Sequence, residues 1–171
     1  MSMNIIGLVG GKGVGKDTFY HTLKALGYPV ERIAFADFIK ADCSNLQGLE
    51  GAPKEVARPV WQAYGQAVKE IHGQNYWIRR LERYLTCTRD TEYLVLTDVR
   101  FPFEADWVRG NGGYLIKLTR PIATLTNTDQ HVSEQSWQSI RTDANICNDS
   151  TRPDYVKKIL HHWGPITNHF I

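Results

Sequence analysis

A glycine-rich segment follows a short apolar run near the beginning of the chain and limits the possible folds more than any other feature. After Ile5–Val9 the chain reads Gly10-Gly11-Lys12-Gly13-Val14-Gly15-Lys16-Asp17-Thr18. Gly10, Gly15 and Lys16 match the pattern of a phosphate-binding loop between a buried strand and a helix. Glycines let the backbone bend sharply and bring its N–H groups onto phosphate oxygens. We therefore expect a strand at Asn4–Val9, a phosphate loop, and a helix over Lys16–Leu26.

The residues of this loop have separate expected roles toward a nucleoside triphosphate. Lys16 should reach the β- and γ-phosphates, and the positive end of the following helix favours the same anion. Thr18 lies in the first helical turn, where its hydroxyl can meet another phosphate oxygen. The pattern has Ser or Thr after the lysine as a Mg²⁺ ligand, whereas this chain has Asp17. A carboxylate also binds Mg²⁺ well, so Asp17 is the expected metal ligand. The alternative is a glycine-rich turn capped by Asp17 or Thr18.

The rest of the chain alternates between strand and helix patterns. Strands are predicted at Arg32–Ala36, Tyr93–Thr97, Tyr114–Thr119 and Ala144–Cys147. Helices are predicted at Phe38–Asn45, Glu55–His72, Tyr76–Thr88 and Phe103–Arg109, with a closing helix that carries Val156, Ile159, Leu160 and Trp163. This order predicts an α/β fold of the P-loop NTPase type, with a mainly parallel sheet flanked by helices on both faces. The length of 171 residues fits a single domain over residues 1–171.

The helix predicted at Glu55–His72 has one apolar and one polar stripe. The apolar stripe contains Val56, Val60, Tyr64, Ala67, Val68 and Ile71. Gly65 lies inside this helix, where glycine costs about 1 kcal/mol relative to alanine. It indicates either a tight contact between helices or the close approach of a ligand, and spacing alone does not separate the two.

Composition excludes several classes of protein. The 20 basic and 18 acidic residues give a net charge of +2, so a nucleic-acid polymer is not an expected partner. The three cysteines are odd in number and far apart, which indicates neither a disulfide framework nor a metal knuckle. Ile5–Val9 is too short to cross a membrane. We expect a cytoplasmic protein with no membrane partner.

A second motif places an acidic residue near the end of an apolar strand, in Tyr93-Leu94-Val95-Leu96-Thr97-Asp98. P-loop enzymes hold the Mg²⁺ shell at such a position. The Asn-Lys-x-Asp and Asp-x-x-Gly motifs of GTPase switches do not occur, and the length fits a small kinase better than a motor. Arginine suits a phosphate clamp because its guanidinium is bidentate and always charged. The candidates are Arg58, Arg100, Arg120 and Arg141, and Arg100 is favoured because it follows Asp98 by two residues.

The chain resembles the bacteriophage deoxynucleoside monophosphate (dNMP) kinases, a branch of the P-loop kinases. The resemblance rests on an ordered set of pieces along nearly the whole chain. They are Gly15-Lys16-Asp17-Thr18, Phe38-Ile39-Lys40, the Arg58–Gly65 segment, Tyr76-Trp77, Asp98-Val99-Arg100 with Glu104, Thr119-Arg120-Pro121, His131-Val132-Ser133-Glu134 and Asn148-Asp149-Ser150. The Gly-Lys-Asp-Thr form is typical of this family, so Asp17 agrees with it.

The resemblance implies a nucleoside monophosphate kinase-like fold and transfer of the ATP γ-phosphate to a dNMP with Mg²⁺. ATP would be held by Lys12, Gly13, Gly15, Lys16, Asp17 and Thr18, with Asn148 and Asp149 near the adenine. The acceptor would face Ile39, Lys40, Arg58, Gly65, Gln66, Trp77, Asp98, Arg100 and Glu104. The catalytic set would be Lys16, Asp98, Arg100 and Arg120. An acceptor-binding helical region is expected at residues 37–90 and a lid at residues 120–140. By analogy a homodimer is a reasonable expectation, as is the host cytoplasm for a phage-encoded enzyme.

Some alternatives stay open at this stage. Trp77 and Ile39 can be core residues, and Glu104 can be a solvated helix charge. The stretch between Lys40 and Arg58 is shorter than is typical of the family, so the acceptor base is open and includes a modified pyrimidine such as 5-hydroxymethyl-dUMP. A P-loop kinase for another phosphorylated metabolite, for instance phosphomevalonate, and a non-catalytic ATP-binding regulatory module are the competing functions.

Overall fold

The computed structural model describes residues 3–46, 48–87, 91–121 and 136–171. It forms two compact units, the first made of Met1–Ile33 with Asp90–Ile171 and the second of Ala34–Arg89. The second unit covers nearly the same residues as the helical region that was expected to bind the acceptor. No helix in the described ranges combines the length and the apolar character that a membrane span needs.

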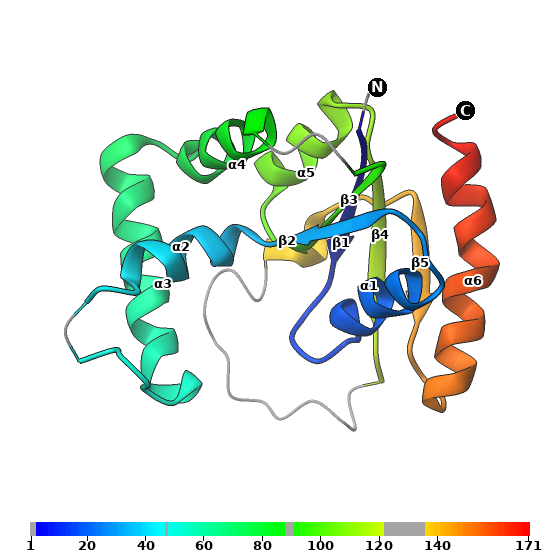
Figure 1. The fold of residues 1–171 in the computed structure, drawn as a ribbon, viewed down its shortest axis with the longest axis horizontal. Coiled ribbons are helices and arrows are strands. Elements are labelled where there is room, and N and C mark those ends of the chain that lie inside the picture. Colours follow the sequence, from blue (N-terminus) through cyan, green and yellow to red (C-terminus); the bar gives the residue numbers. More distant parts are fainter. Residues whose placement is uncertain (1–2, 47, 88–90, 122–135) are drawn as a thin grey trace. The chain divides into compact units, whose positions relative to one another are not determined.

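The first unit is built on a five-stranded sheet (Figure 1). Its strands are β1 (Asn4–Val9), β2 (Val30–Ile33), β3 (Tyr93–Val99), β4 (Tyr114–Thr119) and β5 (Ala144–Cys147). The strand order is β2-β3-β1-β4-β5, and all four neighbouring pairs are parallel. β1 is therefore central, and the segment that follows it leaves the sheet between β3 and β4. The predicted α/β fold with a parallel sheet is confirmed.

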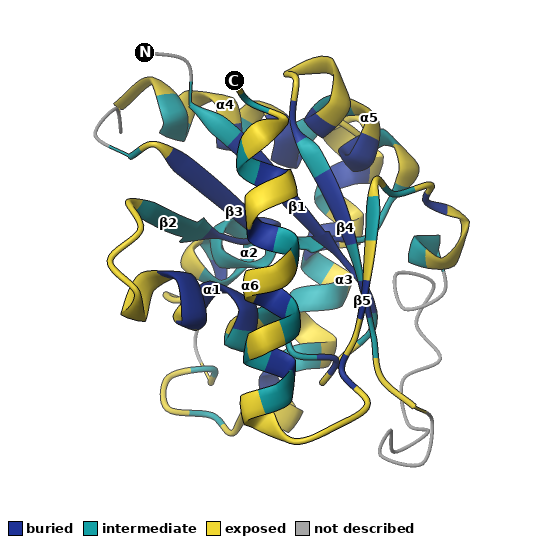
Figure 2. Ribbon diagram, turned by 90° about the vertical axis from the view of Figure 1, so that its right-hand side faces the viewer, coloured by how far each residue is buried: buried dark blue, intermediate teal, exposed yellow. Residues whose placement is uncertain are grey.

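Both faces of the sheet are covered, as a parallel sheet requires. The described part of this unit contains the helices α1 (Lys16–Ala25), α5 (Pro102–Gly110) and α6 (Arg152–Asn168), together with the short 3₁₀ helix η3 (Ser136–Ser139). On one face Ile6 and Leu8 of β1 join a buried cluster with residues of α1 and α6. On the other face Gly7 approaches Val108 of α5. Figure 2 shows the buried central strands and the exposed outer side of α6.

The second unit consists of three helices, α2 (Phe35–Cys43), α3 (Lys54–His72) and α4 (Tyr76–Cys87). A polar cluster joins all three of them. The Arg80 guanidinium of α4 lies 2.9 Å from Asp42 Oδ1 of α2, and the Tyr64 hydroxyl of α3 donates to Asp42 Oδ2 at 3.5 Å. Since Asp42 is mostly buried, with 17% of its side chain exposed, this shared carboxylate helps to hold the helices in one arrangement.

Several predicted boundaries were wrong. β2 spans Val30–Ile33 instead of Arg32–Ala36, because its pairing with β3 runs from Val30 to Ile33 and Phe35 and Ala36 already belong to the next helix. α2 begins at Phe35 rather than Phe38, because Asp37 Oδ2 accepts a hydrogen bond from the Ala34 N–H at 3.0 Å and caps the helix. β3 continues to Val99, since its pairing with β1 extends to Val9. Asp98 thus lies within the strand.

The apolar stripe on α3 does not coincide with the buried face of the helix. Val56 and Ile71 are 58% and 75% exposed, whereas Ala57, Gly65 and Lys69 are buried. α3 packs through its small residues, because these allow a neighbouring helix to approach closely. In the closing helix α6, Leu160 is likewise exposed.

Candidate active site

The glycine-rich segment forms a tight loop between β1 and α1, as predicted. Gly10 has a φ of 149°, and a β-carbon at this position would lie 2.4 Å from the Leu118 carbonyl oxygen of β4. Gly10 is therefore required both by its backbone conformation and by the close approach of a neighbouring strand. The loop ends at Gly15, and α1 begins at Lys16 with Asp17 in its first turn.

Lys16 lies over the loop that precedes it. Its ammonium donates to the carbonyl oxygens of Gly10 at 2.7 Å and Gly11 at 2.6 Å. The charge is thus held at the start of α1, where the unpaired N–H groups of the first helical turn also favour an anion. A lysine ammonium beside these N–H groups is an arrangement that suits the binding of an anion such as phosphate.

The charge of Asp17 is partly balanced by a residue that sequence reasoning missed. Asp17 Oδ1 lies 3.8 Å from Nε of Arg32 on β2, and the Asp17 side chain is 78% exposed. An exposed carboxylate beside the phosphate loop is a hard oxygen donor that suits Mg²⁺. Among the described residues no group of three or more acidic, histidine or cysteine side chains could hold a metal alone. The Asp17 carboxylate fits Mg²⁺ as one oxygen donor, with phosphate and water oxygens as the kind of further ligand that this ion takes.

Asp98 and Arg100 lie at the carboxyl end of β3, next to the end of β1, and both side chains are partly buried. Glu104 in the first turn of α5 is buried at 6% exposure, so its alternative interpretation as a solvated helix charge is wrong. Its Oε2 accepts hydrogen bonds from the backbone N–H groups of Arg100 at 2.8 Å and Phe101 at 3.0 Å. Glu104 thus caps α5 and fixes the backbone that carries Arg100.

The ends of β4 and β5 bring further predicted residues to the same edge of the sheet. Arg120 follows β4, and its Nη1 donates to the Gly13 carbonyl at 3.3 Å. Asn148 follows β5, is buried, and its Nδ2 donates to the Val14 carbonyl at 3.1 Å. Asp149 is held by the ammonium of Lys158, and this hydrogen bond is the main cause that lowers the pKa of the Asp149 carboxyl.

In the second unit, three residues predicted to face the acceptor form a tight packing contact. The Trp77 indole is 4% exposed, and its Nε1 donates to the Gly65 carbonyl at 3.2 Å. A β-carbon on Gly65 would lie 2.7 Å from Cδ1 of Ile39. These contacts support the tight helix contact that was one of the two interpretations of Gly65. They also favour a packing role for Trp77.

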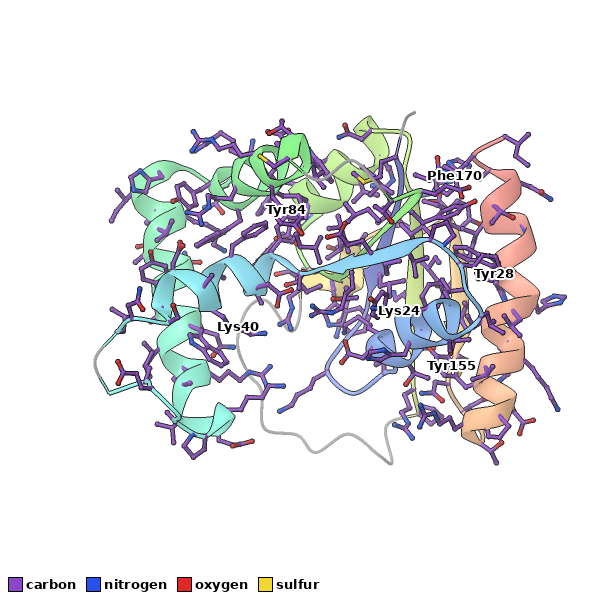
Figure 3. The ribbon with its side chains drawn as sticks, viewed as in Figure 1. Lys24, Tyr28, Lys40, Tyr84, Tyr155 and Phe170 are labelled. Carbon is purple, nitrogen blue, oxygen red and sulfur yellow. The ribbon has the colours of Figure 1, made fainter. Side chains whose placement is uncertain are left out.

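The other acceptor candidates of the second unit are more accessible. Lys40 Nζ lies 3.4 Å from Asp37 Oδ1 and 5.7 Å from the ring centre of Trp61, which is only partly buried. Arg58 on α3 is one helical turn before Trp61 and is also partly buried. The exposed Gln66 donates to Glu70 Oε1 at 2.8 Å. Trp61 was not singled out from the sequence, and its contact with Lys40 becomes visible only in the structure. The labelled Lys40 in Figure 3 shows the position of this group on α2.

Of the expected lid at residues 120–140, residues 122–135 lie outside the described ranges, and with them His131-Val132-Ser133-Glu134. The flanking residues are described. Arg120 contacts the loop as stated above, and Trp137 of η3 lies beside Gly11, with its ring 3.6 Å from where a β-carbon would be. Lys117 Nζ lies 5.3 Å from the Trp137 ring centre.

Comparison with known proteins identifies the family. Residues 53–159, more than half of the chain, match the family of deoxynucleotide monophosphate kinases. The chain belongs to this family. Its members are ATP-dependent kinases, and the P-loop kinase fold described above agrees with that assignment. The predicted resemblance is therefore confirmed at the family level, whereas an origin in a bacteriophage remains a prediction.

One relative covers nearly the whole chain. A protein of Acanthamoeba polyphaga mimivirus, provisionally named a deoxynucleotide monophosphate kinase, is 28% identical over 191 aligned residues, which span 92% of this chain and 95% of the relative. This relative thus comes from a mimivirus, whereas the resemblance in the sequence pointed to bacteriophage kinases.

Solved structures show the same fold at low sequence identity. TT1252 from Thermus thermophilus matches with a TM-score of 0.58 and 17% identity, over 96% of this chain and 98% of its own. Dephospho-CoA kinase from Campylobacter jejuni matches with a TM-score of 0.54 and 14% identity, over 97% and 98%. Shikimate kinase from Aquifex aeolicus has a TM-score of 0.52 and 14% identity, over 94% and 96%. At these identities the likeness establishes the P-loop kinase fold and leaves the acceptor open.

Proposed function

We propose that this kinase transfers the γ-phosphoryl group of ATP to the phosphate of a deoxynucleoside monophosphate and so forms the diphosphate. The match of residues 53–159 to the kinase family carries the proposal. This stretch includes most of the residues assigned to the acceptor, namely Arg58, Gly65, Gln66, Trp77, Asp98, Arg100 and Glu104. The phosphate loop and the convergence of Asp98 and Arg120 at the same edge of the sheet support the ATP side of the reaction.

The nucleotide triphosphate would be bound by the loop and the start of α1. Backbone N–H groups from Lys12 to Lys16 would hold its phosphates, while the Lys16 ammonium would move from the loop carbonyls to the β- and γ-phosphates. Thr18 would add a hydroxyl donor. Arg120 already lies at the loop and would neutralise charge on the transferred group. Mg²⁺, held by Asp17 directly or through water, would supply further charge neutralisation.

The acceptor phosphate needs positioning more than it needs a base. Its second pKa is about 6, so at neutral pH it is mainly a dianion that can attack without losing a proton. Arg100 would clamp this phosphate, and its backbone is fixed by Glu104. Asp98 would orient the acceptor or the water shell of the metal. Bringing the two phosphates together in line then supplies much of the rate enhancement.

Residues of the second unit would bind the rest of the acceptor. Lys40 and Arg58 carry the positive charge of this group, and Gln66 is exposed on α3. Ile39, Gly65 and Trp77 would shape the site mainly by packing the three helices. The proposed acceptors include a modified pyrimidine nucleotide such as 5-hydroxymethyl-dUMP. A homodimer and a location in the host cytoplasm are further parts of the proposal.

The direct test is coupled ADP release with ATP, Mg²⁺ and each deoxynucleoside and ribonucleoside monophosphate in turn. We expect release that depends on one or a few deoxynucleotides. Lys16→Ala should abolish it, while Lys157→Ala, which removes an exposed lysine of α6, should leave it unchanged. MgATP binding without release for any nucleotide would refute the proposal and favour a metabolite kinase or a regulatory module.

A further inference from the structure

The carbonyl groups of the phosphate loop are bonded to side chains one after another. Gly10 and Gly11 accept from Lys16, and Gly13 accepts from Arg120. The last two carbonyls of the loop, those of Val14 and Gly15, accept from Asn148 at 3.1 Å and from the Tyr155 hydroxyl at 3.2 Å. The carbonyls of Gly10, Gly11, Gly13, Val14 and Gly15 thus all accept from a side-chain donor.

The direction of a carbonyl decides the direction of the next N–H group. In a planar trans peptide the C=O of one residue and the N–H of the next point in opposite directions. The bond from Asn148 to the Val14 carbonyl therefore turns the Gly15 N–H away from Asn148. The Gly15 carbonyl also accepts from the Phe19 N–H at 3.0 Å, the first backbone bond of α1. The Tyr155 hydroxyl is its second donor, and together they set the direction of the Lys16 N–H. The Gly15 and Lys16 N–H groups stand where the loop meets the start of α1, at the anion site.

Asn148 and Tyr155 differ from Lys16 and Arg120 in charge and burial. They are neutral, and they are 9% and 1% exposed. Burial raises the pKa of Tyr155 far above its usual value, so its hydroxyl remains a protonated donor. Since neither side chain carries a charge that a phosphate would attract, both can remain on the loop throughout the reaction.

The two donors stand on rigid parts of the first unit. The Asn148 N–H donates to the Thr119 carbonyl at 2.8 Å, which ties the end of β5 to the end of β4. Tyr155 lies in the first turns of α6, whose N-cap is Thr151. In Figure 3 the labelled Tyr155 extends from α6 toward the loop end of α1. Donors on such supports can hold a loop in one conformation.

The packing around Gly15 shows how closely these side chains meet the loop. Gly15 has a φ of 106°, and a β-carbon there would lie 2.8 Å from Tyr155 Cε1 and 2.9 Å from Asn148 Nδ2. Asn148 and Tyr155 therefore both pack against Gly15 and donate to the two peptide groups on either side of its α-carbon.

We propose that Asn148 and Tyr155 are positioning residues, which aim the Gly15 and Lys16 N–H groups at the nucleotide phosphate and do not contact ATP themselves. This role differs from the expected position of Asn148 beside the adenine. It concerns only the binding of MgATP, so it stands or falls independently of the acceptor.

The test measures MgATP affinity by calorimetry without any acceptor, for Tyr155→Phe and Asn148→Ala. Each variant should weaken binding about fivefold, as expected for the loss of one hydrogen bond that orients a binding group. Asn148→Gln, which keeps the amide donor, should recover part of the loss. The control is Tyr114→Phe, which removes a hydroxyl at the opposite end of β4 and should leave the affinity unchanged.

Three further readouts separate positioning from general stability. The KM for the acceptor should stay within about twofold of wild type, and the loss in the double variant should be smaller than the product of the single losses, because both side chains act on one loop. In each variant, the affinity for ATP analogues that lack the base should fall by the same factor as the affinity for MgATP. Unchanged MgATP affinity in Tyr155→Phe, a change of one atom, would overturn the proposal, as would a loss in Asn148→Ala confined to ligands that carry adenine.

Discussion

Glu104→Ala should destabilise the protein, because this carboxylate accepts two backbone N–H groups at the start of α5. The bonds from Arg100 at 2.8 Å and Phe101 at 3.0 Å are made to a side chain that is 6% exposed. A hydrogen bond to a charged group contributes about 1.5–3 kcal/mol when its loss leaves the partner unpaired. Water can replace part of this at the partly buried Arg100 and Phe101, so we expect a total loss of about 3 kcal/mol.

For a chain of 171 residues, this loss corresponds to a decrease in Tm of roughly 6–12 °C. It can be measured by differential scanning calorimetry and by urea unfolding, which give the free energy directly. Glu104→Gln keeps one acceptor oxygen and should lose about half as much. Asp106→Ala in the same helix removes an exposed carboxylate whose partner is Arg109, and it should change the free energy of unfolding by no more than about 0.5 kcal/mol.

Activity separates this capping role from direct contact with the acceptor. Below the unfolding temperature of Glu104→Ala we expect a moderate decrease in kcat/KM for the acceptor, because the backbone that carries Arg100 becomes less ordered. A variant that melts within 1 °C of wild type but has a greatly increased acceptor KM would refute the reasoning. Glu104 would then act on the acceptor itself.

Three further predictions concern other parts of the molecule. Arg100→Ala should raise the acceptor KM more than tenfold and leave the ATP KM within twofold, and steady-state kinetics showing both values unchanged would exclude it as a clamp. Trp77→Phe should lower the free energy of unfolding in urea by about 1 kcal/mol through loss of its bond to Gly65. Trp61→Ala should mainly raise the acceptor KM in steady-state kinetics. A raised acceptor KM in Trp77→Phe together with lost stability in Trp61→Ala would contradict the packing role of Trp77. Burial raises the pKa of Tyr155 above the ordinary value of about 10, so its contribution to stability is complete below pH 10 and is lost as the pH rises further, by about 1.4 kcal/mol per pH unit. Urea unfolding between pH 9 and 11 should therefore show a shallower decline in Tyr155→Phe, and identical slopes would contradict a buried neutral hydroxyl.

Segments with strong local signals were predicted well from the sequence. β1, β4 and β5 have the predicted boundaries, and α1 begins at the predicted Lys16. Short apolar and β-branched runs between glycines or polar turns specify such strands locally. The start of α2 was missed although a local signal exists, since Asp37 stands three residues after Ala34 and caps it.

Other features could not be predicted because they depend on which surfaces meet. The apolar periodicity of α3 predicted a helix correctly, but the apolar stripe is not the face that the structure buries. α3 packs on its neighbours through Ala57 and Gly65, and a helix contact through small residues leaves Val56 and Ile71 outside. Periodicity reports the presence of a helix, whereas the size of the residues at a contact decides how closely two helices approach.

The phosphate loop and the order of strands and helices along the chain follow from the sequence by itself, because glycine spacing and hydrophobic patterning are local properties. The kinase family was predicted from the resemblance of an ordered set of motifs. Which side chains donate to the carbonyls of the loop could be seen only in the tertiary structure. Arg120, Asn148 and Tyr155 are separated from their loop carbonyls by 107, 134 and 140 positions. They meet the loop because a parallel sheet gathers the carboxyl ends of its strands at one edge, and α6 begins at that edge directly after β5. No local pattern records which side chain then reaches which carbonyl.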